Sequence, residues 1–240
     1  MIDIHSHILP EVDDGSRSIA ETITMISEAY KNGITDIIAT SHYMEGNYEV
    51  NKNKREEMVN ILKKILTIKE LPVKIYIGAE VYISSNLIKN IKDNEIPTLN
   101  NSKYLLFELP MNTPYFGLYN EINHLKDLKI VPILAHPERY PYIRNDINKL
   151  YELIDMGVLV QCNVGSFIGK YGKDAKKFVT KMSKENLINF IASDCHRQDS
   201  IYSDLEKIQK KVIKIIGKEN WERWAVVNPK YIIENKEIIK

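Results

Sequence analysis

The chain has 240 residues, of which 44% are hydrophobic and 27% are charged, so it can bury one substantial core and we expect a single domain over residues 1–240. Its formal net charge is only +1 and its lysines are spread along the chain, which argues against a nuclease that grips a nucleic-acid backbone. No apolar run approaches the ~20 residues of a membrane-spanning helix, and the opening segment lacks the basic and apolar regions of a signal peptide. We therefore expect a soluble cytoplasmic protein without membrane insertion.

Short β-rich runs alternate with helical patterns from end to end, which is typical of repeated βα units around a parallel sheet. Most runs are apolar throughout, as strands buried on both faces should be. The predicted strands are Ile2–His5, Ile34–Thr40, Val73–Glu80, Tyr104–Leu109, Ile130–Ala135, Val158–Asn163 and Ile188–Ser193. This alternation favours an α/β fold with a closed or nearly closed barrel.

The helices between these strands are predicted from apolar residues spaced three or four apart. The clearest run over Ile19–Tyr30, Met58–Ile65 and Leu205–Ile215. Ser18 and Glu21 form a capping-box pattern before the first of them. Near the end of the sequence, Asn228 and Pro229 indicate the N-cap and first residue of a last short helix.

Potential metal ligands follow the predicted strands at or just beyond their carboxyl ends. They are His5, His7, His42, Glu80, Glu108, His136, Asp194 and His196. In a parallel barrel these ends share one face, where barrel enzymes hold their active sites. Five of the six histidines occupy such positions, and only His124 lies in a helical stretch. A single strand histidine is usually a hydrogen-bonded core residue, but eight converging positions favour a metal centre because buried acids without a cation would repel one another.

Residue spacing supports this interpretation. Side chains two apart on extended backbone point the same way, so His5 and His7 can approach one ion together, and so can Asp194 and His196. Cys195 lies between the latter two and should face away from the site. It and the other cysteine of the chain lack a CxxC spacing, so we expect two reduced core thiols.

The loop after the first strand adds two acids, Asp13 and Asp14, which precede Gly15 and can bend back over the strand ends. We expect one of the two to bind metal. Nine imidazole and carboxylate ligands without sulfur suit Mn²⁺, Fe²⁺ or Zn²⁺, and they exceed what one ion can use. The sequence therefore predicts two or three ions that share bridging carboxylates.

Such a cluster lowers the pKa of a bridging water and clamps phosphoryl oxygens, so hydrolysis is the expected reaction. Two arginines follow predicted ligands: Arg139 lies three residues after His136, and Arg197 directly follows His196. A guanidinium suits bidentate phosphate recognition. For Arg139 we favour phosphate contact over an ion pair with Glu138, whereas for Arg197 a catalytic and a scaffold role remain equally open.

Loop tyrosines are expected on the same rim: Tyr43, Tyr48, Tyr115, Tyr140 and Tyr142. Such residues can pack an aromatic substrate, although more often they only pack the loops.

The segments MIDIHSHILPEVDDGS, ATSH, GAE, FELP, AHPERY and SDCH, in this order and spacing, strongly resemble the bacterial CpsB/YwqE-type manganese-dependent protein-tyrosine phosphatases of the PHP superfamily. The resemblance runs from Met1 to about the last helix. It implies a distorted seven-stranded (β/α)7 TIM-like barrel and a phosphoric monoester hydrolase. Its substrate would be phosphotyrosine on the tail of a bacterial tyrosine kinase, in the regulation of capsular or exopolysaccharide synthesis.

The resemblance also implies three ions, expected to be Mn²⁺ with Fe²⁺, Zn²⁺ or Co²⁺ as alternatives, and a bridging hydroxide. The ligand sets would be His5, His7, Glu80 and Asp194; Glu80, Glu108 and His136; and Asp14, His42 and His196. Arg139 would grip the phosphate. The chain departs from the family's pattern at Ser41, where proline is common, and at Arg197, where asparagine is common. It also lacks the further arginine usual past the last histidine, which Arg197 could replace.

Two other functions compete with this prediction. A PHP phosphatase for a small metabolite, such as histidinol phosphate, would keep the metal chemistry and change only the pocket walls. A non-catalytic binding protein would use its metals only to hold the barrel together, but structural sites usually close their coordination with protein ligands. No pattern in the sequence specifies an oligomeric state.

Overall fold

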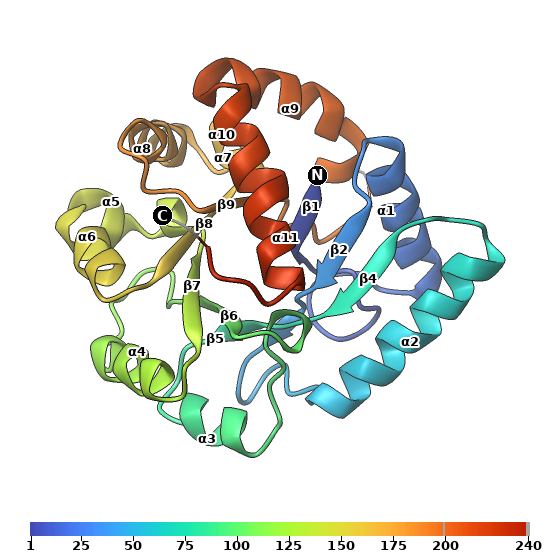
Figure 1. The fold of residues 1–240 in the computed structure, drawn as a ribbon, viewed down its shortest axis with the longest axis horizontal. Helices are drawn as coiled ribbons and strands as arrows, with labels where there is room; N and C mark the ends of the chain where they lie inside the picture. Colours follow the sequence, from blue (N-terminus) through green and yellow to red (C-terminus); the bar gives the residue numbers. More distant parts are fainter. Residues whose placement is uncertain (199, 239–240) are drawn as a thin grey trace.

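Parallel strands form the wall of a barrel and helices surround it (Figure 1). The computed structural model describes residues 1–198 and 200–238. Its strands are β1 (Ile2–Ser6), β2 (Asp36–Ala39), β3 (His42–Tyr43), β4 (Lys74–Ile77), β5 (Glu80–Tyr82), β6 (Tyr104–Glu108), β7 (Val131–Ala135), β8 (Leu159–Asn163) and β9 (Phe190–Ala192). Every ladder between them is parallel.

The strands form two sheets, in the orders β1-β2-β4 and β3-β5-β6-β7-β8-β9. β3 continues the path of β2, and β5 continues that of β4, so the two sheets share a wall. The other junction is a bridge between Ser6 and Cys195, flanked by a 2.9 Å hydrogen bond from the amide of Asp194 to the carbonyl of His5. The ring thus closes with seven strand positions, and the predicted barrel of βα units is confirmed.

The third predicted strand is interrupted at Gly78, between β4 and β5. A Cβ atom at Gly78 would lie 2.8 Å from a methyl carbon of Ile38 and 3.1 Å from side-chain atoms of Leu99 and Thr40. Only glycine fits this approach, because a methyl group there would require its neighbours to move. At Gly78 the wall passes from β4, which pairs with β2, to β5, which pairs with β3 and β6.

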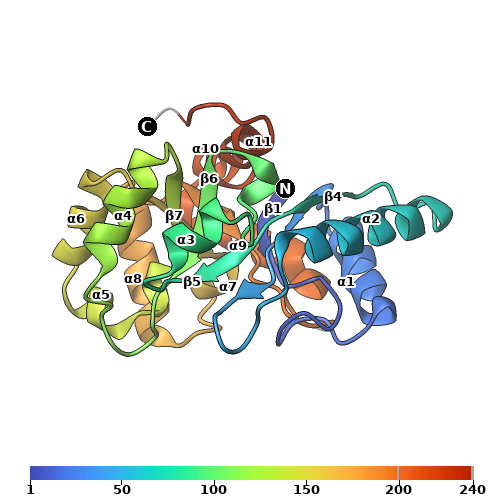
Figure 2. The ribbon, with the colours of Figure 1, turned by 90° about the horizontal axis from the view of Figure 1, so that it is seen from below.

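Helices cover the outside of the barrel (Figures 1 and 2). They are α1 (Ile19–Lys31), α2 (Lys52–Ile68), α3 (Leu87–Lys92), α4 (Leu118–Asp127), α5 (Pro141–Asn145), α6 (Asn148–Asp155), α7 (Val164–Phe167), α8 (Lys173–Lys184), α9 (Ile201–Ile216), α10 (Lys218–Glu222) and α11 (Asn228–Ile233). The predicted cap of α1 is confirmed, since the Ser18 hydroxyl accepts a 3.1 Å hydrogen bond from the amide of Glu21. The three predicted amphipathic helices lie within α1, α2 and α9.

The predicted N-cap at Asn228 is wrong. A π-helical turn, Arg223–Val227, joins α10 to α11 without a break, so Asn228 has helical φ and ψ values of −62° and −44°. Inside a continuous helix the following backbone amides already donate to carbonyls of the preceding turn, so the side chain finds no free amide to cap. Its side-chain amide instead donates a 2.8 Å hydrogen bond to the carbonyl of Asn189.

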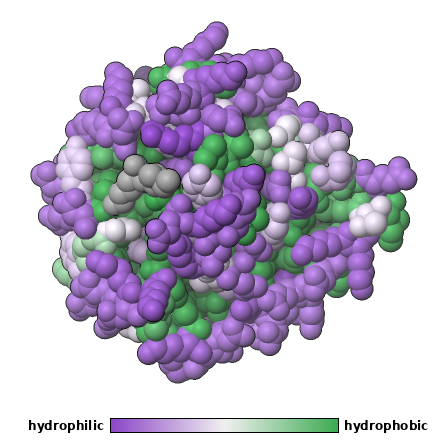
Figure 3. Space-filling view, in the orientation of Figure 1, coloured by the Kyte–Doolittle hydropathy of each residue, from purple (hydrophilic) through white to green (hydrophobic). Residues whose placement is uncertain are grey.

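The barrel interior is apolar toward the amino ends of the strands. Ile4, Ile133 and Phe190 are buried there, and Ile232 of α11 packs against the same cluster. Figure 2 shows α10 and α11 at one end of the barrel, and Figure 3 shows that the surface on this side is mainly hydrophilic. Since α11 covers this end, the polar residues that follow the strands lie toward the opposite one.

None of the helices in the described part of the chain is both long and apolar enough to cross a bilayer.

Candidate metal centre

His5 in β1, His7 just beyond it and Glu80 at the start of β5 form the centre of a buried polar cluster. The Nε2 atoms of His5 and His7 lie 3.2 Å apart. Oε2 of Glu80 is 3.1 Å from the first nitrogen and 3.3 Å from the second. Oδ1 of Asp194, just past β9, is 3.4 and 3.5 Å from the same two nitrogens. Four predicted ligands therefore aim at one small volume.

Glu80 connects this group to a second one. Nδ1 of His42 lies 3.1 Å from Oε2 of Glu80 and 2.9 Å from Oε1 of Glu108. The other oxygen of Glu80, Oε1, lies 2.9 Å from Nε2 of His136. His42, Glu80 and Glu108 form one compact group, and His136 borders it through Glu80.

A third group is more open to solvent. Asp14 Oδ1 lies 3.7 Å from Nε2 of His42 and 3.5 Å from Nε2 of His196, and its side chain is 55% exposed. The ring of His196 stacks on His7 at a centroid distance of 3.7 Å. His7, Asp14, His42 and His196 thus make up the third group. All nine predicted ligands are brought to the same face of the barrel, and His124 lies apart on α4.

The spacing of these atoms fits divalent cations. Ligand atoms bonded at about 2.1 Å to a tetrahedral or octahedral ion lie about 3.0–3.4 Å from one another, close to the separations found here. Within residues 1–198 and 200–238, four buried atoms of the cluster form no hydrogen bond, despite the close polar neighbours of three of them: Glu80 Oε2, Asp194 Oδ1, His42 Nδ1 and His136 Nδ1. Burying such atoms without a partner is costly, so a cation is the partner that this donor set suits.

The electrostatics show how tightly the groups are coupled. Burial lowers the pKa of His5, but Glu80 and Asp194 outweigh it and raise that pKa to about 9. Burial raises the pKa of Glu80, yet His5 and His42 hold it well below its usual range. Without cations His5 and His7 are therefore imidazolium groups facing ionised carboxylates, whereas burial and the neighbouring His7 lower the pKa of His196 to about 4. Metal binding would displace these imidazolium protons.

Two predicted ligands have strained backbone. His136 and Asp194 have φ values of 36° and 53°, in the left-handed region that residues with a side chain seldom adopt. His136 is fixed there by a 2.8 Å hydrogen bond from its amide to the carbonyl of Gln161. Strain of this kind concentrates at functional sites, where the surrounding structure holds it in place. Here it turns the chain sharply at the ends of β7 and β9.

Asp13 belongs to none of the three groups and instead holds two of the predicted ligands by hydrogen bonds. Its Oδ2 accepts hydrogen bonds from Nδ1 of His7 at 2.7 Å and from the amide of His42 at 2.6 Å, while Oδ1 accepts one from the amide of Gly15 at 2.9 Å. A carboxylate behind a metal-binding histidine fixes its tautomer and ring direction. Sequence reasoning named Asp13 only as an alternative to Asp14, and missed this positioning role.

Two further buried residues position the first strand. The ring of His5 is held by a 2.8 Å contact between Nδ1 and Oε1 of Gln161 on β8. Asp3 accepts hydrogen bonds from the amide of Ser193 at 3.0 Å and the hydroxyl of Tyr202 at 2.7 Å, so it ties β1 to the end of β9. Their signal in the sequence is a polar residue inside a predicted buried strand.

Arg139 contacts the cluster directly. Its Nη1 lies 3.0 Å from Oδ2 of Asp194, and its side chain is 28% exposed. The alternative partner Glu138 is engaged elsewhere, since its Oε1 accepts hydrogen bonds from the amide of Asn163 at 2.9 Å and the hydroxyl of Ser166 at 2.6 Å. The guanidinium is therefore beside the predicted ligands and within reach of solvent.

Arg197 occupies a different environment. Its guanidinium donates a hydrogen bond to the carbonyl of Gly15 and lies 3.8 Å from Oε2 of Glu21. These contacts hold the loop after β1 against α1. Cys195, between Asp194 and His196, is buried in the apolar core as predicted.

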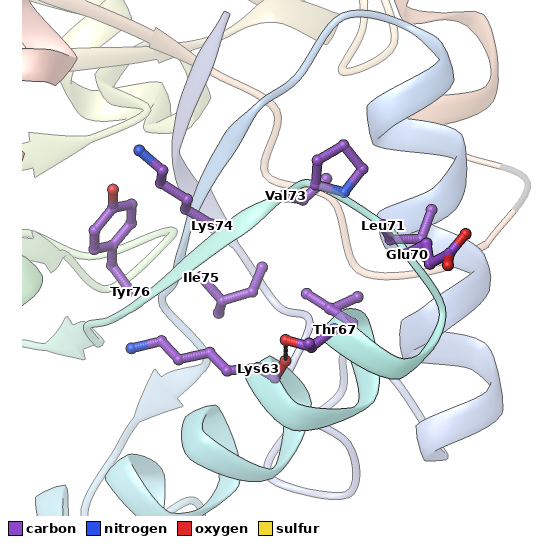
Figure 4. A pocket seen from close by; sticks show the side chains of 10 residues that line it. Lys63, Thr67, Glu70, Leu71, Val73, Lys74, Ile75 and Tyr76 are labelled. Atoms are coloured by element: carbon purple, nitrogen blue, oxygen red, sulfur yellow. Dashed lines mark hydrogen bonds between the residues drawn. The ribbon is translucent and has the colours of Figure 1, made fainter.

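A groove of about 620 Å³ lies away from this chemistry, between the end of α2 and the start of β4 (Figure 4). Lys63 and Thr67 line it from α2, and Lys74 and Tyr76 from β4. The groove lies at the start of β4, whereas Glu80 begins β5, which continues from the other end of β4. The residues that line the groove include no histidine, so it does not compete with the cluster as a metal centre.

The fold and the cluster together define a class of protein, the metal-dependent α/β-barrel hydrolases. Comparison with known proteins narrows this class. A family described as "Capsular polysaccharide synthesis, CpsB/CapC" matches residues 1–234. The putative tyrosine-protein phosphatase CapC of Staphylococcus aureus is 40% identical over 198 residues, which cover 82% of this chain and 77% of CapC. The tyrosine-protein phosphatase CpsB of Streptococcus pneumoniae is 34% identical to this chain, and the match covers 99% of this chain and all of CpsB.

The solved structures agree. A crystal structure from work on YwqE of Bacillus subtilis and CpsB of Streptococcus pneumoniae, described as metal-dependent tyrosine phosphatases, superposes with a TM-score of 0.93. It is 31% identical and covers all of this chain and 96% of its own. Histidinol phosphate phosphatase from Lactococcus lactis shares the fold, with a TM-score of 0.59 and 16% identity over 90% of this chain and 92% of its own. The chain belongs to the CpsB/CapC family, with a PHP-type barrel.

Proposed function

We propose that this protein hydrolyses phosphotyrosine in a protein substrate, the tail of a bacterial tyrosine kinase, and thereby regulates capsular or exopolysaccharide synthesis. The observation that carries the proposal is the convergence of nine imidazole and carboxylate side chains on one barrel face, with the Arg139 guanidinium 3.0 Å from Asp194. Membership of the CpsB/CapC family supports the tyrosine phosphatase activity, because the curated relatives carry that name. The expected cytoplasmic location would give the enzyme access to such a tail.

We assign three ions to the cluster, with Mn²⁺ as the expected metal and Fe²⁺, Zn²⁺ or Co²⁺ as alternatives. The ligand sets are His5, His7, Glu80 and Asp194; Glu80, Glu108 and His136; and Asp14, His42 and His196. Nδ1 of His42 lies 2.9 Å from Oε1 of Glu108, and His42 groups with Glu80 and Glu108, so we assign it as a shared ligand of the second and third sets. When bound, such ions supply an activated water near neutral pH and neutralise phosphoryl oxygens.

The protein's own residues orient the substrate and its phosphate. Arg139 uses one Nη1 donor on Asp194, and its planar fork has further N–H donors that can bind phosphoryl oxygens. Asp13 and Gln161 keep the rings of His7 and His5 aimed at the cluster. The side chains that face the reacting phosphate are thus held in place before substrate arrives, which favours catalysis.

A polypeptide substrate is supported by an apolar pocket of about 180 Å³ on the same side of the barrel, lined among others by Leu109, Tyr115 and Tyr142. Tyr140 links this pocket to the cluster, since its ring lies 5.6 Å from that of His136 and 5.8 Å from that of Tyr142. The pocket is thus connected to the cluster through adjacent aromatic rings. It offers room for one apolar side chain near the phosphotyrosine, which a small metabolite would not use.

The test is a parallel assay of the metal-supplemented enzyme on a phosphotyrosine peptide, histidinol phosphate and single-stranded DNA. We expect turnover of the peptide, and we expect it to exceed that of the other two substrates. A preference for histidinol phosphate would overturn the tyrosine phosphatase assignment. Bound metal without turnover of any substrate would instead favour the non-catalytic binding protein.

A further inference from the structure

A short loop after α7 brings a tyrosine to Arg139, the arginine proposed to bind phosphate. Gly169 and Gly172 border the loop, and their φ values of 87° and 94° lie in the left-handed region. The amide of Gly172 donates a 3.1 Å hydrogen bond to the carbonyl of Gly169, and the amide of Lys170 donates one of 3.0 Å to the carbonyl of Gly165. The turn is therefore fixed on both sides of Tyr171, which points its side chain at the metal centre.

Tyr171 contacts both partners of the ion pair beside the cluster. Its ring lies against the guanidinium of Arg139, with 4.8 Å between the guanidinium carbon and the ring centroid. Its hydroxyl lies 3.4 Å from Oδ2 of Asp194, the same oxygen that Arg139 and Asn163 approach at 3.0 and 2.6 Å. Arg139 is thus bounded by a carboxylate at its edge and by an aromatic ring on its face.

The two contacts use different parts of the guanidinium. Asp194 occupies one in-plane N–H donor, the same kind of donor that a phosphate needs. The ring of Tyr171 touches the flat face, and a cation–π contact on that face leaves the in-plane donors free. An arginine held by its face keeps its orientation while its in-plane donors bind an anion. The entropy cost of ordering the side chain is then met before phosphate binds, and it does not reduce the phosphate affinity.

We infer that Tyr171 is a positioning residue for phosphate recognition: its ring holds the Arg139 guanidinium in place for the phosphoryl group of the substrate. The inference rests on the proposed role of Arg139 in binding phosphate. It adds a residue outside the predicted ligands and arginines, from a loop that carries none of them. The ring is the active part, and the hydroxyl, with its long contact to Asp194, is secondary.

The test compares Tyr171→Leu and Tyr171→Phe by two measurements, the affinity for inorganic phosphate by calorimetry and kcat/KM on a phosphotyrosine peptide. Removal of the ring should weaken phosphate binding and kcat/KM by about tenfold, whereas phenylalanine should retain both within about twofold. Tyr151→Leu is the matched control, because Tyr151 also donates to a carboxylate, Glu185, but lies on α6 away from the site. Equal losses for leucine and phenylalanine would overturn the role of the ring.

A double-mutant cycle with Arg139→Ala shows whether Tyr171 acts through the arginine. In that background Tyr171→Leu should cost less than about twofold, because the partner of the ring is already gone. Independent, multiplicative losses would refute the inference, and so would loss of bound metal in Tyr171→Leu, since that would mean action through Asp194.

A fluorinated series protects the test against a variant that does not fold. Phenylalanine and its difluoro and pentafluoro analogues at position 171 keep the shape of the ring while weakening its attraction for a cation. Phosphate affinity should fall with each step, and no trend would refute the inference. Phosphate binding is measured without turnover, so failure of the wild-type enzyme on phosphotyrosine would reject the proposed function and still leave the role of Tyr171 decided.

Discussion

Replacing Asp13 with asparagine exchanges one carboxylate oxygen for an amide group without changing the shape of the side chain. The two oxygens of Asp13 accept three hydrogen bonds, from His7, His42 and Gly15, in a site where its side chain is fully buried. An asparagine has only one acceptor oxygen. If this oxygen faces His7 and His42, the NH2 group of the asparagine faces the N–H of Gly15, so that two donors meet. If it faces Gly15, His7 must move its proton to Nε2, the nitrogen that points into the cluster.

Either orientation leaves a buried donor unpaired, which costs about 1–3 kcal/mol. Loss of a residue that orients a metal-binding histidine lowers metal affinity or activity by about 10–100-fold. We therefore expect Asp13→Asn to lower the free energy of unfolding of the metal-free protein, and to bind Mn²⁺ about 10–100-fold more weakly. Denaturant unfolding after chelation and a Mn²⁺ titration of activity measure the two effects separately.

Asp14→Asn is the control for this experiment. Asp14 carries the same charge and is the next residue, but its side chain is 55% exposed. Its substitution should leave the metal-free stability within about 0.5 kcal/mol of wild type while it removes a proposed ligand and lowers metal content. If Asp13→Asn matched wild type in both stability and Mn²⁺ affinity, the positioning role of Asp13 would be wrong. If Asp14→Asn kept full metal content, Asp14 would not be a ligand.

Three further outcomes are expected. His136→Ala should abolish hydrolysis while circular dichroism shows a folded barrel, because the residue lies at a strand end; retained activity would contradict its ligand role. Arg139→Ala should lower kcat/KM on a phosphopeptide by about 10²–10³-fold with metal content unchanged, since a guanidinium cannot ligate a cation, and loss of metal would make it a scaffold residue. Chelation should remove activity and lower the melting temperature, because buried carboxylates lose their counter-charge; Mn²⁺ should restore both, and an unchanged melting temperature would count against a buried metal centre.

The barrel and its catalytic face were predictable because both depend on local patterns. Apolar runs define strands, and an acid or histidine placed just past such a run falls on the shared carboxyl face of a parallel barrel. His5 and His7 needed only the alternation of an extended strand. The split of the third strand at Gly78 was missed, because it depends on the side chains of Ile38 and Leu99, which approach the glycine only in the folded barrel.

The residues that hold the ligands were harder to find. Asp13 and Tyr171 reach the site from loops that fold back over the barrel, and Gln161 reaches His5 from β8, 156 residues along the chain. Tyr171 comes eight residues after the end of β8, in a segment with no strand to mark its position. Its neighbours Gly169 and Gly172 were the one available signal, since paired glycines indicate a tight turn but do not indicate which residue it presents.

The closure of the ring between Ser6 and Cys195 has a consequence for how the molecule is made. His5 lies in the first strand and His7 just after it, but Asp194, which approaches both, is separated from them by almost the whole sequence. During synthesis, β1 has no partner on this side until the last strand has left the ribosome. Contacts of such long sequence separation form slowly, and cations that bind across the junction stabilise only the closed ring. Metal ions should therefore bind after the barrel has closed and stabilise the closed form.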